Sequence, residues 1–270
     1  MSVVASAFAR ATAVAPLGDG AWGATCDRAW TTALGPNGGY LAAIVLRAMI
    51  AELDDPTRET RSLTCHYLRS PSEGEVRIEV ALERRGRSLS TLTARLLQDG
   101  RVCVIATATF AIELEGALDY DDRVPPEVPA PEAIAPLAPP PDIPIVGHFE
   151  VRPAIGGEPL SGAPGAVTGG WLRFADPQAL DAPAVAMYAD GWLPSPMPRL
   201  TRPAVAPTVD LTVHFRAPAA AAAIVQEPVL VVFRSATSAG GFFEEDGELW
   251  SRDGVLLAHS RQLALLLEAR

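Results

Sequence analysis

Apolar and polar residues alternate along several stretches of the chain, as they do in strands that bury one face. Between Val76 and Leu82, for example, apolar positions alternate with Arg77 and Glu79. The pattern predicts four strands in each half of the chain. The first four are expected at 62–70, 75–84, 88–98 and 102–114, and the second four at 208–217, 225–237, 241–252 and 255–267.

A helix is expected before each set of four strands. The first runs from Tyr40 to about Leu53 and is apolar nearly all round, so other structure should wrap it. The second begins at Asp181-Ala182-Pro183, or earlier at Asp176-Pro177, and runs to about Trp192. An antiparallel sheet wrapped around an apolar helix, made twice, is an α+β fold. Shorter strand-like pieces precede the helices at 11–15 and 20–27, and near 149–154 and 168–175.

Two segments of the chain repeat each other. Residues 63–71 read Leu-Thr-Cys-His-Tyr-Leu-Arg-Ser-Pro, and residues 211–218 read Leu-Thr-Val-His-Phe-Arg-Ala-Pro. Asp99-Gly100 is likewise echoed by Asp253-Gly254, so the offsets are 211 − 63 = 148 and 253 − 99 = 154. A period of about half the chain is too long for a solenoid repeat and indicates a duplicated domain. Polar groups kept in only one copy are then the first place to look for function.

The two copies are separated by a proline-rich segment. Nine of the 25 prolines lie between Pro125 and Pro144, which favours an extended, semi-rigid connection. We therefore divide the chain into an N-terminal domain at 1–115, a linker at 116–147 and a C-terminal domain at 148–270.

Composition excludes several classes of function. The net charge of −10 argues against a nucleic-acid partner. All 22 basic residues are arginine, so Schiff-base, pyridoxal-phosphate and Walker A lysine chemistry is excluded, and arginines or backbone amides must make any phosphate contact. The three cysteines are widely spaced, and no motif predicts a metal or cofactor. No signal peptide or membrane span is recognisable, so we expect a cytoplasmic protein.

Short motifs in both halves resemble those of acyl-CoA thioesterase II (TesB-like) proteins, and they occur in the same order. They are Ser62 to Pro71, Arg85 to Ser90, Ala189-Asp190, Thr208-Val209-Asp210, Ser235 to Ala239, Gly241-Phe242, Asp253 to Ala258, and Gln262. The resemblance covers nearly the whole chain outside the linker. It implies a double hotdog fold, in which two sheets, each wrapped around a central helix, join into one continuous sheet.

The same resemblance implies that Asp190, Thr208 and Gln262 hold the water that attacks a thioester. A hydroxyl and an amide can both donate and accept, so such a trio can orient one water, and the carboxylate can take its proton. We expect Asp190 toward the C-terminal end of its helix, where the macrodipole disfavours a carboxylate. Plainer roles stay open: Asp190 could bond nearby amides, Thr208 could simply open a strand, and Gln262 could face outward.

Other polar residues compete for a role. Asp210 is two residues from Thr208 and expected on the same strand face, so it is a rival carboxylate. The Gly38-Gly39 pair could admit a phosphate at a helix N-terminus, but close packing is the more ordinary explanation. His66 and His214 occupy equivalent repeat positions and are expected to serve the scaffold, and His148 and His259 to be structural or surface groups.

The predicted function is hydrolysis of acyl-CoA to a free acid and CoA, in lipid metabolism, by a protein that forms a homo-oligomer. The alternatives are a hotdog enoyl-CoA hydratase-like enzyme, which needs an Asp/His pair, and a non-catalytic acyl- or acyl-CoA-binding protein. Five prolines between Asp190 and Thr208 depart from the usual loop of the family, so the sequence leaves the acyl chain undefined.

Overall fold

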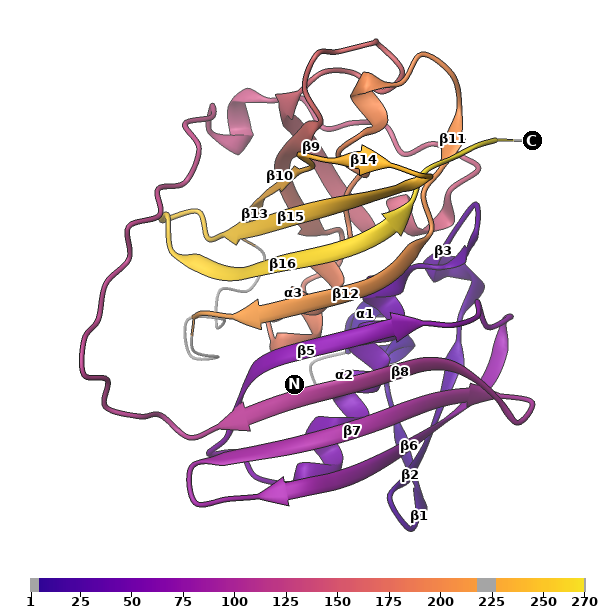
Figure 1. The fold of residues 1–270 in the computed structure, drawn as a ribbon, viewed down its shortest axis with the longest axis vertical. Helices are drawn as coiled ribbons and strands as arrows, with labels where there is room; N and C mark the ends of the chain where they lie inside the picture. The colour runs from indigo at the N-terminus through magenta and orange to yellow at the C-terminus, as the bar shows by residue number, and fades with distance from the viewer. Residues whose placement is uncertain (1–4, 218–226, 270) are drawn as a thin grey trace.

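The computed structural model describes residues 5–217 and 227–269 (Figure 1). Within these residues thirteen strands form one antiparallel sheet, in the order β1-β2-β6-β7-β8-β5-β12-β16-β15-β13-β10-β9, with β14 added beside β15. The strands of the first half are β1 (Ala15–Gly18), β2 (Ala21–Cys26), β5 (Glu59–Tyr67), β6 (Gly74–Arg85), β7 (Leu89–Gln98) and β8 (Arg101–Ala111). Those of the second half are β9 (Phe149–Gly156), β10 (Val167–Phe174), β12 (Thr208–Phe215), β13 (Val229–Arg234), β14 (Ser238–Ala239), β15 (Phe242–Trp250) and β16 (Leu256–Leu265).

Two small strand pairs lie outside the main sheet. They are β3 (Thr31–Thr32) with β4 (Gly35–Pro36), and β11 (Ala204–Val205) with β17 (Leu267–Glu268). Apart from the one at 11–15, the expected strands are present with shifted ends. Residues 225 and 226, which begin the expected strand 225–237, lie outside the described part of the chain.

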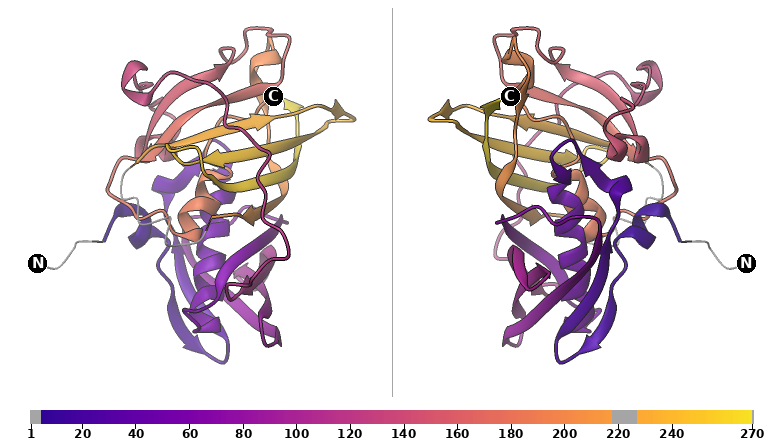
Figure 2. Two further views of the ribbon diagram at one scale, coloured as in Figure 1. Left: turned by 90° about the vertical axis from the view of Figure 1, so that its left-hand side faces the viewer. Right: turned by 90° about the vertical axis from the view of Figure 1, so that its right-hand side faces the viewer.

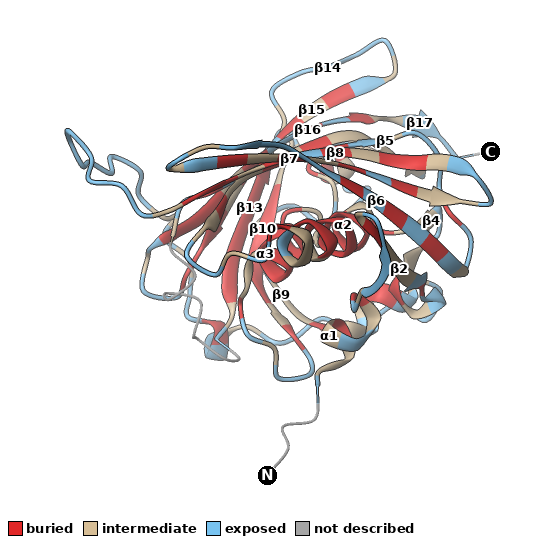
Figure 3. Ribbon diagram, turned by 90° about the horizontal axis from the view of Figure 1, so that it is seen from below, coloured by how far each residue is buried: buried red, intermediate tan, exposed pale blue. Residues whose placement is uncertain are grey.

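Three α-helices of the described residues lie on the concave side of the sheet: α1 (Ala7–Ala11), α2 (Gly38–Leu53) and α3 (Ala182–Tyr188) (Figure 3). Eleven of the sixteen residues of α2 are buried, as its nearly continuous apolar surface predicts. The strand expected at 11–15 is wrong, because the first part of this segment ends α1, which Ser6 caps by accepting a hydrogen bond from Ala9 N.

The second helix is shorter than expected. Asp181 caps its start by accepting a hydrogen bond from Ala184 N, but α3 ends at Tyr188 rather than near Trp192. Asp190 therefore lies in the turn after the helix. This correction matters because a turn residue can direct its side chain at a neighbouring element.

The repeated segments are the two strands that join the halves. β5 pairs with β12, with Leu63 opposite Val213, Thr64 opposite Thr212 and Cys65 opposite Leu211. Thr64 and Thr212 are equivalent in the repeat, and their hydroxyl oxygens are 3.0 Å apart. A pseudo-twofold axis therefore passes between these threonines. The structure has the double hotdog fold that the resemblance implies.

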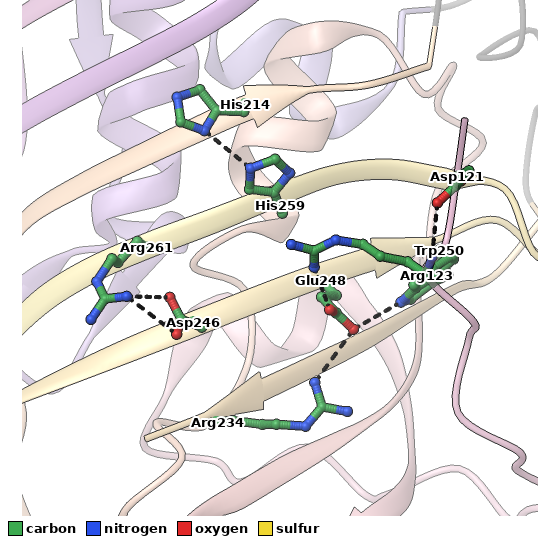
Figure 4. Close-up of polar contacts among 9 residues, drawn as sticks. All are labelled: Asp121, Arg123, His214, Arg234, Asp246, Glu248, Trp250, His259 and Arg261. Atoms are coloured by element: carbon green, nitrogen blue, oxygen red, sulfur yellow. Dashed lines mark hydrogen bonds and ion pairs between the residues drawn. The ribbon is translucent and has the colours of Figure 1, made fainter. Parts of the chain in front are cut away.

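The proline-rich segment crosses the outside of the second half instead of hanging free (Figures 1 and 2). Within 116–147 it forms no strand, only short 3-10 turns at 131–133 and 144–148. Val128 and Ile134 pack against a small apolar cluster on the outer face that includes Trp171, whose indole donates to Pro129 O at 2.9 Å. Arg123 bonds Glu248 of β15 at 2.6 Å (Figure 4). The domain boundaries at 115/116 and 147/148 stay a prediction.

The contact between α2 and α3 generates a stability prediction. A Cβ atom on Gly39 would lie 2.7 Å from Met187 O and 3.1 Å from Ala186 O, which are main-chain atoms that cannot swing aside. We expect Gly39→Ala to lower the free energy of unfolding by about 1–3 kcal/mol, because overpacking forces the helices apart. Urea unfolding measures the change. Gly147→Ala is the control, since nothing lies within 4 Å of a Cβ at that position. Equal stability of both variants would contradict the prediction.

Candidate active site

A cavity of about 370 Å³ opens between the two halves, at the N-terminal end of α2. Its volume falls within the range of roughly 300–1,000 Å³ that is usual for ligand pockets. Apolar side chains from both halves line much of its wall, and the proline-containing loop after Asp190 contributes to it. These apolar lining residues include Leu34, Leu41, Trp192, Pro194, Pro207, Val209, Phe233, Phe243 and Leu265.

Asp190 directs its carboxylate at the start of α2. Its Oδ2 accepts from Gly39 N at 3.0 Å and from Asn37 Nδ2 at 3.0 Å. Asn37 also caps α2 by accepting from Tyr40 N, and its Nδ2 donates to Asp190 O at 2.9 Å. The helix macrodipole that the sequence predicted to disfavour this carboxylate is therefore not the one that acts on it most directly. The carboxylate follows one helix but lies at the N-terminus of another, where the dipole favours negative charge.

The Gly38-Gly39 pair makes this approach possible. A Cβ on Gly38 would lie 2.9 Å from Asp190 Oδ2, and one on Gly39 would collide with the end of α3. Tyr67 supports the same turn, because its hydroxyl donates to Gly38 O at 2.8 Å. The anion position that the pair could have offered to a phosphate is taken by Asp190 itself, so close packing is the role that the structure shows.

Thr208 and Gln262 lie beside this carboxylate, so the three residues singled out in the sequence come together. Thr208 Oγ1 is 3.0 Å from Gln262 Oε1 and 3.4 Å from Asp190 Oδ1. The trio is drawn from the turn after α3, the first residue of β12 and the middle of β16. All three line the cavity.

A β-bulge separates Thr208 from the rival carboxylate. The register between β12 and β16 shifts between Thr208 and Asp210, so the two side chains do not share a face as alternation predicts. Asp210 does not line the cavity, and its Oδ1 accepts from Leu263 N at 3.3 Å. The expectation that Asp210 faces the same way as Thr208 is wrong.

Glu245 belongs to the same hydrogen-bonded chain and was missed in the sequence. It is 3% exposed, and Gln262 Nε2 donates to its Oε1 at 2.5 Å. Its Oε2 accepts from Ser195 N, also at 2.5 Å. The polar chain thus runs from Asp190 through Thr208 and Gln262 to Glu245.

Comparison of the two halves would have found Glu245. Gln262 pairs with Glu245 and with Leu211, and the equivalent Ala108 pairs with Leu92 and with Leu63. Leu63 and Leu211 match in the repeat, so Leu92 and Ala108 are the counterparts of Glu245 and Gln262. The first half is apolar at both positions where the second half is polar.

In its described residues, the first half also lacks a counterpart to the Asp190 carboxylate. The equivalent position is the start of α3, where Arg47 of α2 lies across from the helix end. Its Nη2 is 3.2 Å from Asp181 Oδ2. Arg47 Nε further donates to Thr12 Oγ1 at 2.7 Å. This end of the molecule therefore holds a paired cation where the other end holds a carboxylate facing a cavity.

Burial shifts the pKa values of both carboxyl groups upward. Burial raises the pKa of Asp190 to about 6, although the donors at the start of α2, Gly39 N and Asn37 Nδ2, oppose the shift. Burial likewise raises the pKa of Glu245 to about 7, helped by the nearby Asp190 charge and opposed by Ser195 and Gln262. Asp190 keeps partial exposure because one side faces the cavity. A carboxylate whose pKa is near 6 is ionised at neutral pH and still basic enough to take a proton.

The histidines lie away from this site. His66 and His214 are exposed on the outer face of the sheet, where His214 Nδ1 is 3.2 Å from His259 Nε2 (Figure 4). His148 stacks on Trp30 with ring centroids 4.1 Å apart. Among the described residues, no group of three or more His, Cys, Asp or Glu side chains could hold a metal ion. No helix in residues 5–217 and 227–269 is long and apolar enough to cross a membrane.

Two family models match the chain, one over each half. The acyl-CoA thioesterase N-terminal domain matches residues 26–111, and the acyl-CoA thioesterase C-terminal domain matches residues 125–266. Three curated mycobacterial proteins, each named an uncharacterized protein, also match. The one from Mycobacterium tuberculosis H37Rv is 25% identical over 267 residues, which is 88% of each chain.

Solved structures resemble the chain over nearly its full length. A protein of unknown function with a hot dog fold from Alicyclobacillus acidocaldarius is 30% identical, with a TM-score of 0.90 over 99% of this chain and 100% of that one. A putative thioesterase II from Thermobifida fusca has a TM-score of 0.82 at 23% identity, with 99% of each chain covered. The tesB protein of Mycobacterium avium subs paratuberculosis has a TM-score of 0.78 at 21% identity, over 96% of this chain and 98% of that one. The last two likenesses bear on the fold alone.

The raised pKa of Asp190 predicts how stability depends on pH. The carboxyl group binds its proton more tightly in the folded chain, so its stabilising effect is complete below the unfolded pKa of about 4 and is lost as the pH rises through about 6. We expect the free energy of unfolding of the natural chain, relative to Asp190→Asn, to fall by up to about 3 kcal/mol between pH 4 and pH 8. Contact with cavity water reduces this value. Urea unfolding of both proteins across this range is the measurement, and a difference that stays flat or grows with pH would refute the shift.

Proposed function

Because the chain belongs to the acyl-CoA thioesterase family, we propose that it hydrolyses acyl-CoA thioesters to a carboxylic acid and CoA, with Asp190 as the general base. One observation carries the proposal. The Asp190 carboxylate lies on the wall of an apolar-lined cavity. Beside it are the Thr208 hydroxyl and the Gln262 amide, which can orient a water molecule. The family membership supplies the substrate class, and the acyl chain length stays open.

The reaction that we propose needs one water and one base. The water oxygen attacks the thioester carbonyl carbon while Asp190 Oδ1 takes a water proton, and the carbonyl electron pair moves to its oxygen. The carbonyl then re-forms as the carbon–sulfur bond breaks, and the electron pair leaves with sulfur. The protonated Asp190 returns the proton to the thiolate. A thiolate whose conjugate acid has a pKa of about 8.5 leaves readily, so no covalent intermediate is required.

The start of α2 has a supporting role in this reaction. Gly39 N and Asn37 Nδ2 both bind Oδ2, which leaves Oδ1 for the water. The same two donors favour the ionised carboxylate against the cost of burial. They hold the base in one orientation, which general-base catalysis requires.

The alternatives differ from this proposal in features that can be tested. A hydratase of the hotdog class would need a histidine beside the carboxylate, and none of the described residues that line the cavity is a histidine. A non-catalytic acyl-CoA-binding protein would use the same cavity without turnover. Cytoplasmic location, a homo-oligomer and a role in lipid metabolism remain predictions.

A free-thiol assay with acyl-CoAs from acetyl to palmitoyl tests the proposal. We expect thiol release above the no-enzyme blank, and a loss of roughly 10²–10⁴ in rate for Asp190→Asn, which keeps the shape but removes the base. Asp210→Asn is the matched control, because that carboxylate lies outside the cavity. Near-normal turnover by Asp190→Asn on a good substrate would remove Asp190 from the mechanism. Binding of acyl-CoA without thiol release would favour the non-catalytic alternative.

The two orienting residues should affect the rate less than the base does. Thr208→Val and Gln262→Leu each remove one polar partner of the proposed water, so we expect each to lower kcat by less than Asp190→Asn. The effects should not multiply in the double variant, because both residues act on the same water. Steady-state kinetics of the two single variants and the double variant measure this. Independent, multiplying losses would show that the residues do not act together.

A further inference from the structure

When Glu245 is ionised it has no proton to donate, so it can only accept hydrogen bonds. Both of its oxygens face N–H donors. One donor is the main-chain N–H of Ser195, which cannot rotate away, at 2.5 Å from Oε2. The other is Gln262 Nε2, at 2.5 Å from Oε1. A carboxylate at this position therefore requires that Gln262 present its NH₂ group and not its oxygen.

The orientation of Gln262 in turn decides what faces Thr208. With Nε2 held by Glu245, the amide oxygen Oε1 lies 3.0 Å from Thr208 Oγ1. Thr208 has a single hydroxyl proton and two possible acceptors, Gln262 Oε1 at 3.0 Å and Asp190 Oδ1 at 3.4 Å. The shorter contact is the better hydrogen bond, so the proton goes to Gln262.

This assignment leaves the base free. If Thr208 donated to Asp190 Oδ1, it would take one of the two lone pairs of that oxygen and make the carboxylate less basic. Because the proton points the other way, Oδ1 keeps both lone pairs for water, and Oδ2 remains held by the start of α2. The directions of the hydrogen bonds from Thr208 to Gln262 and from Gln262 to Glu245 thus follow from the Glu245 carboxylate, which can only accept.

We infer that Glu245 is a positioning residue for the hydrolysis, because it fixes the Gln262 amide so that Thr208 donates its proton away from the Asp190 base. This rests on the proposed function, which it deepens by naming what sets the availability of Asp190. The buried position of Glu245 agrees with such a role, since its counterpart in the first half is Leu92, which has no polar chain to direct.

Glu245→Gln tests the inference because it reverses the direction of the hydrogen bonds between Glu245 and Thr208 while keeping the shape of the side chain. Ser195 N–H needs an acceptor, so the new amide oxygen turns toward it and the new NH₂ group faces Gln262. Gln262 must then offer its oxygen to residue 245 and its NH₂ group to Thr208, whose proton moves onto Asp190 Oδ1. We expect kcat to fall by about tenfold to a hundredfold, with KM changed less than about twofold.

Two comparisons separate this effect from a loosened structure. Asp246→Asn is the control, since Asp246 is exposed on the outer face of the same strand and pairs with Arg261 (Figure 4). It should leave kcat unchanged. In a Thr208→Val background there is no hydroxyl proton to redirect, so Glu245→Gln should change kcat by less than about twofold there. An equal loss with and without the Thr208 hydroxyl would overturn the inference.

The pKa of Asp190 gives a readout that needs no turnover. The titratable groups coupled to this carboxylate are Glu245 from β15 and Tyr67 from β5. Glu245→Gln should lower the pKa of Asp190, followed by the ¹³C shift of its carboxyl carbon, because the ion gains the Thr208 proton and loses a negative neighbour. The drop should be smaller in the Thr208→Val background, where only the charge effect remains.

The two readouts distinguish failure of the inference from failure of the proposed function. Absence of thiol release by the natural chain would refute the proposed hydrolysis, while the carboxyl titration would still decide what Glu245 does. Normal hydrolysis together with an equal pKa drop in both backgrounds would refute the role of Glu245 alone.

Discussion

The site depends on one contact between the two halves, in which a carboxylate that follows α3 meets the first amide groups of α2. Four orphan N–H groups at the start of a helix, together with its dipole, make a ready anion site. The protein fills that site with Asp190 rather than with a ligand, and Gly38 and Gly39 let the helices approach closely enough for this. The cavity and the loop after α3 both lie at this meeting of the helix ends.

Duplication explains why the contact is made once and not twice. The pseudo-twofold axis at Thr64 and Thr212 carries the start of α2 onto the start of α3, and even the β-bulge at Thr208 has a counterpart between Thr60 and Ser62. The scaffold is therefore shared, while the side chains placed on it differ. At the start of α3 an ion pair between Arg47 and Asp181 takes the place of the Asp190 carboxylate. The two halves thus share one backbone arrangement but carry different side chains at the equivalent helix starts.

The sequence predicted the fold well because its strongest signals are local. Alternation defined the long strands, a continuous apolar run defined α2, and the repeat at 63–71 and 211–218 indicated a duplicated domain. Thr208, Asp190 and Gln262 were predicted through resemblance, and their convergence required three elements that local patterns do not bring together. What failed depended on tertiary detail. Alternation cannot register a bulge, so Asp210 was expected beside Thr208, and helix propensity did not show that α3 stops before Asp190.

The burial of Glu245 is unfavourable for folding, and comparison with the first half indicates that the fold does not require it. An ionised carboxyl group in a core is unfavourable unless donors compensate it, and replacing such a group by an apolar residue is often neutral or stabilising. The first half has that stable alternative, with Leu92 and Ala108 at the matching positions. Since the same backbone accepts both solutions, folding alone does not require Glu245 and Gln262. Two carboxyl groups whose pKa values burial raises, joined through one hydroxyl and one amide beside a cavity, are instead typical of a functional site.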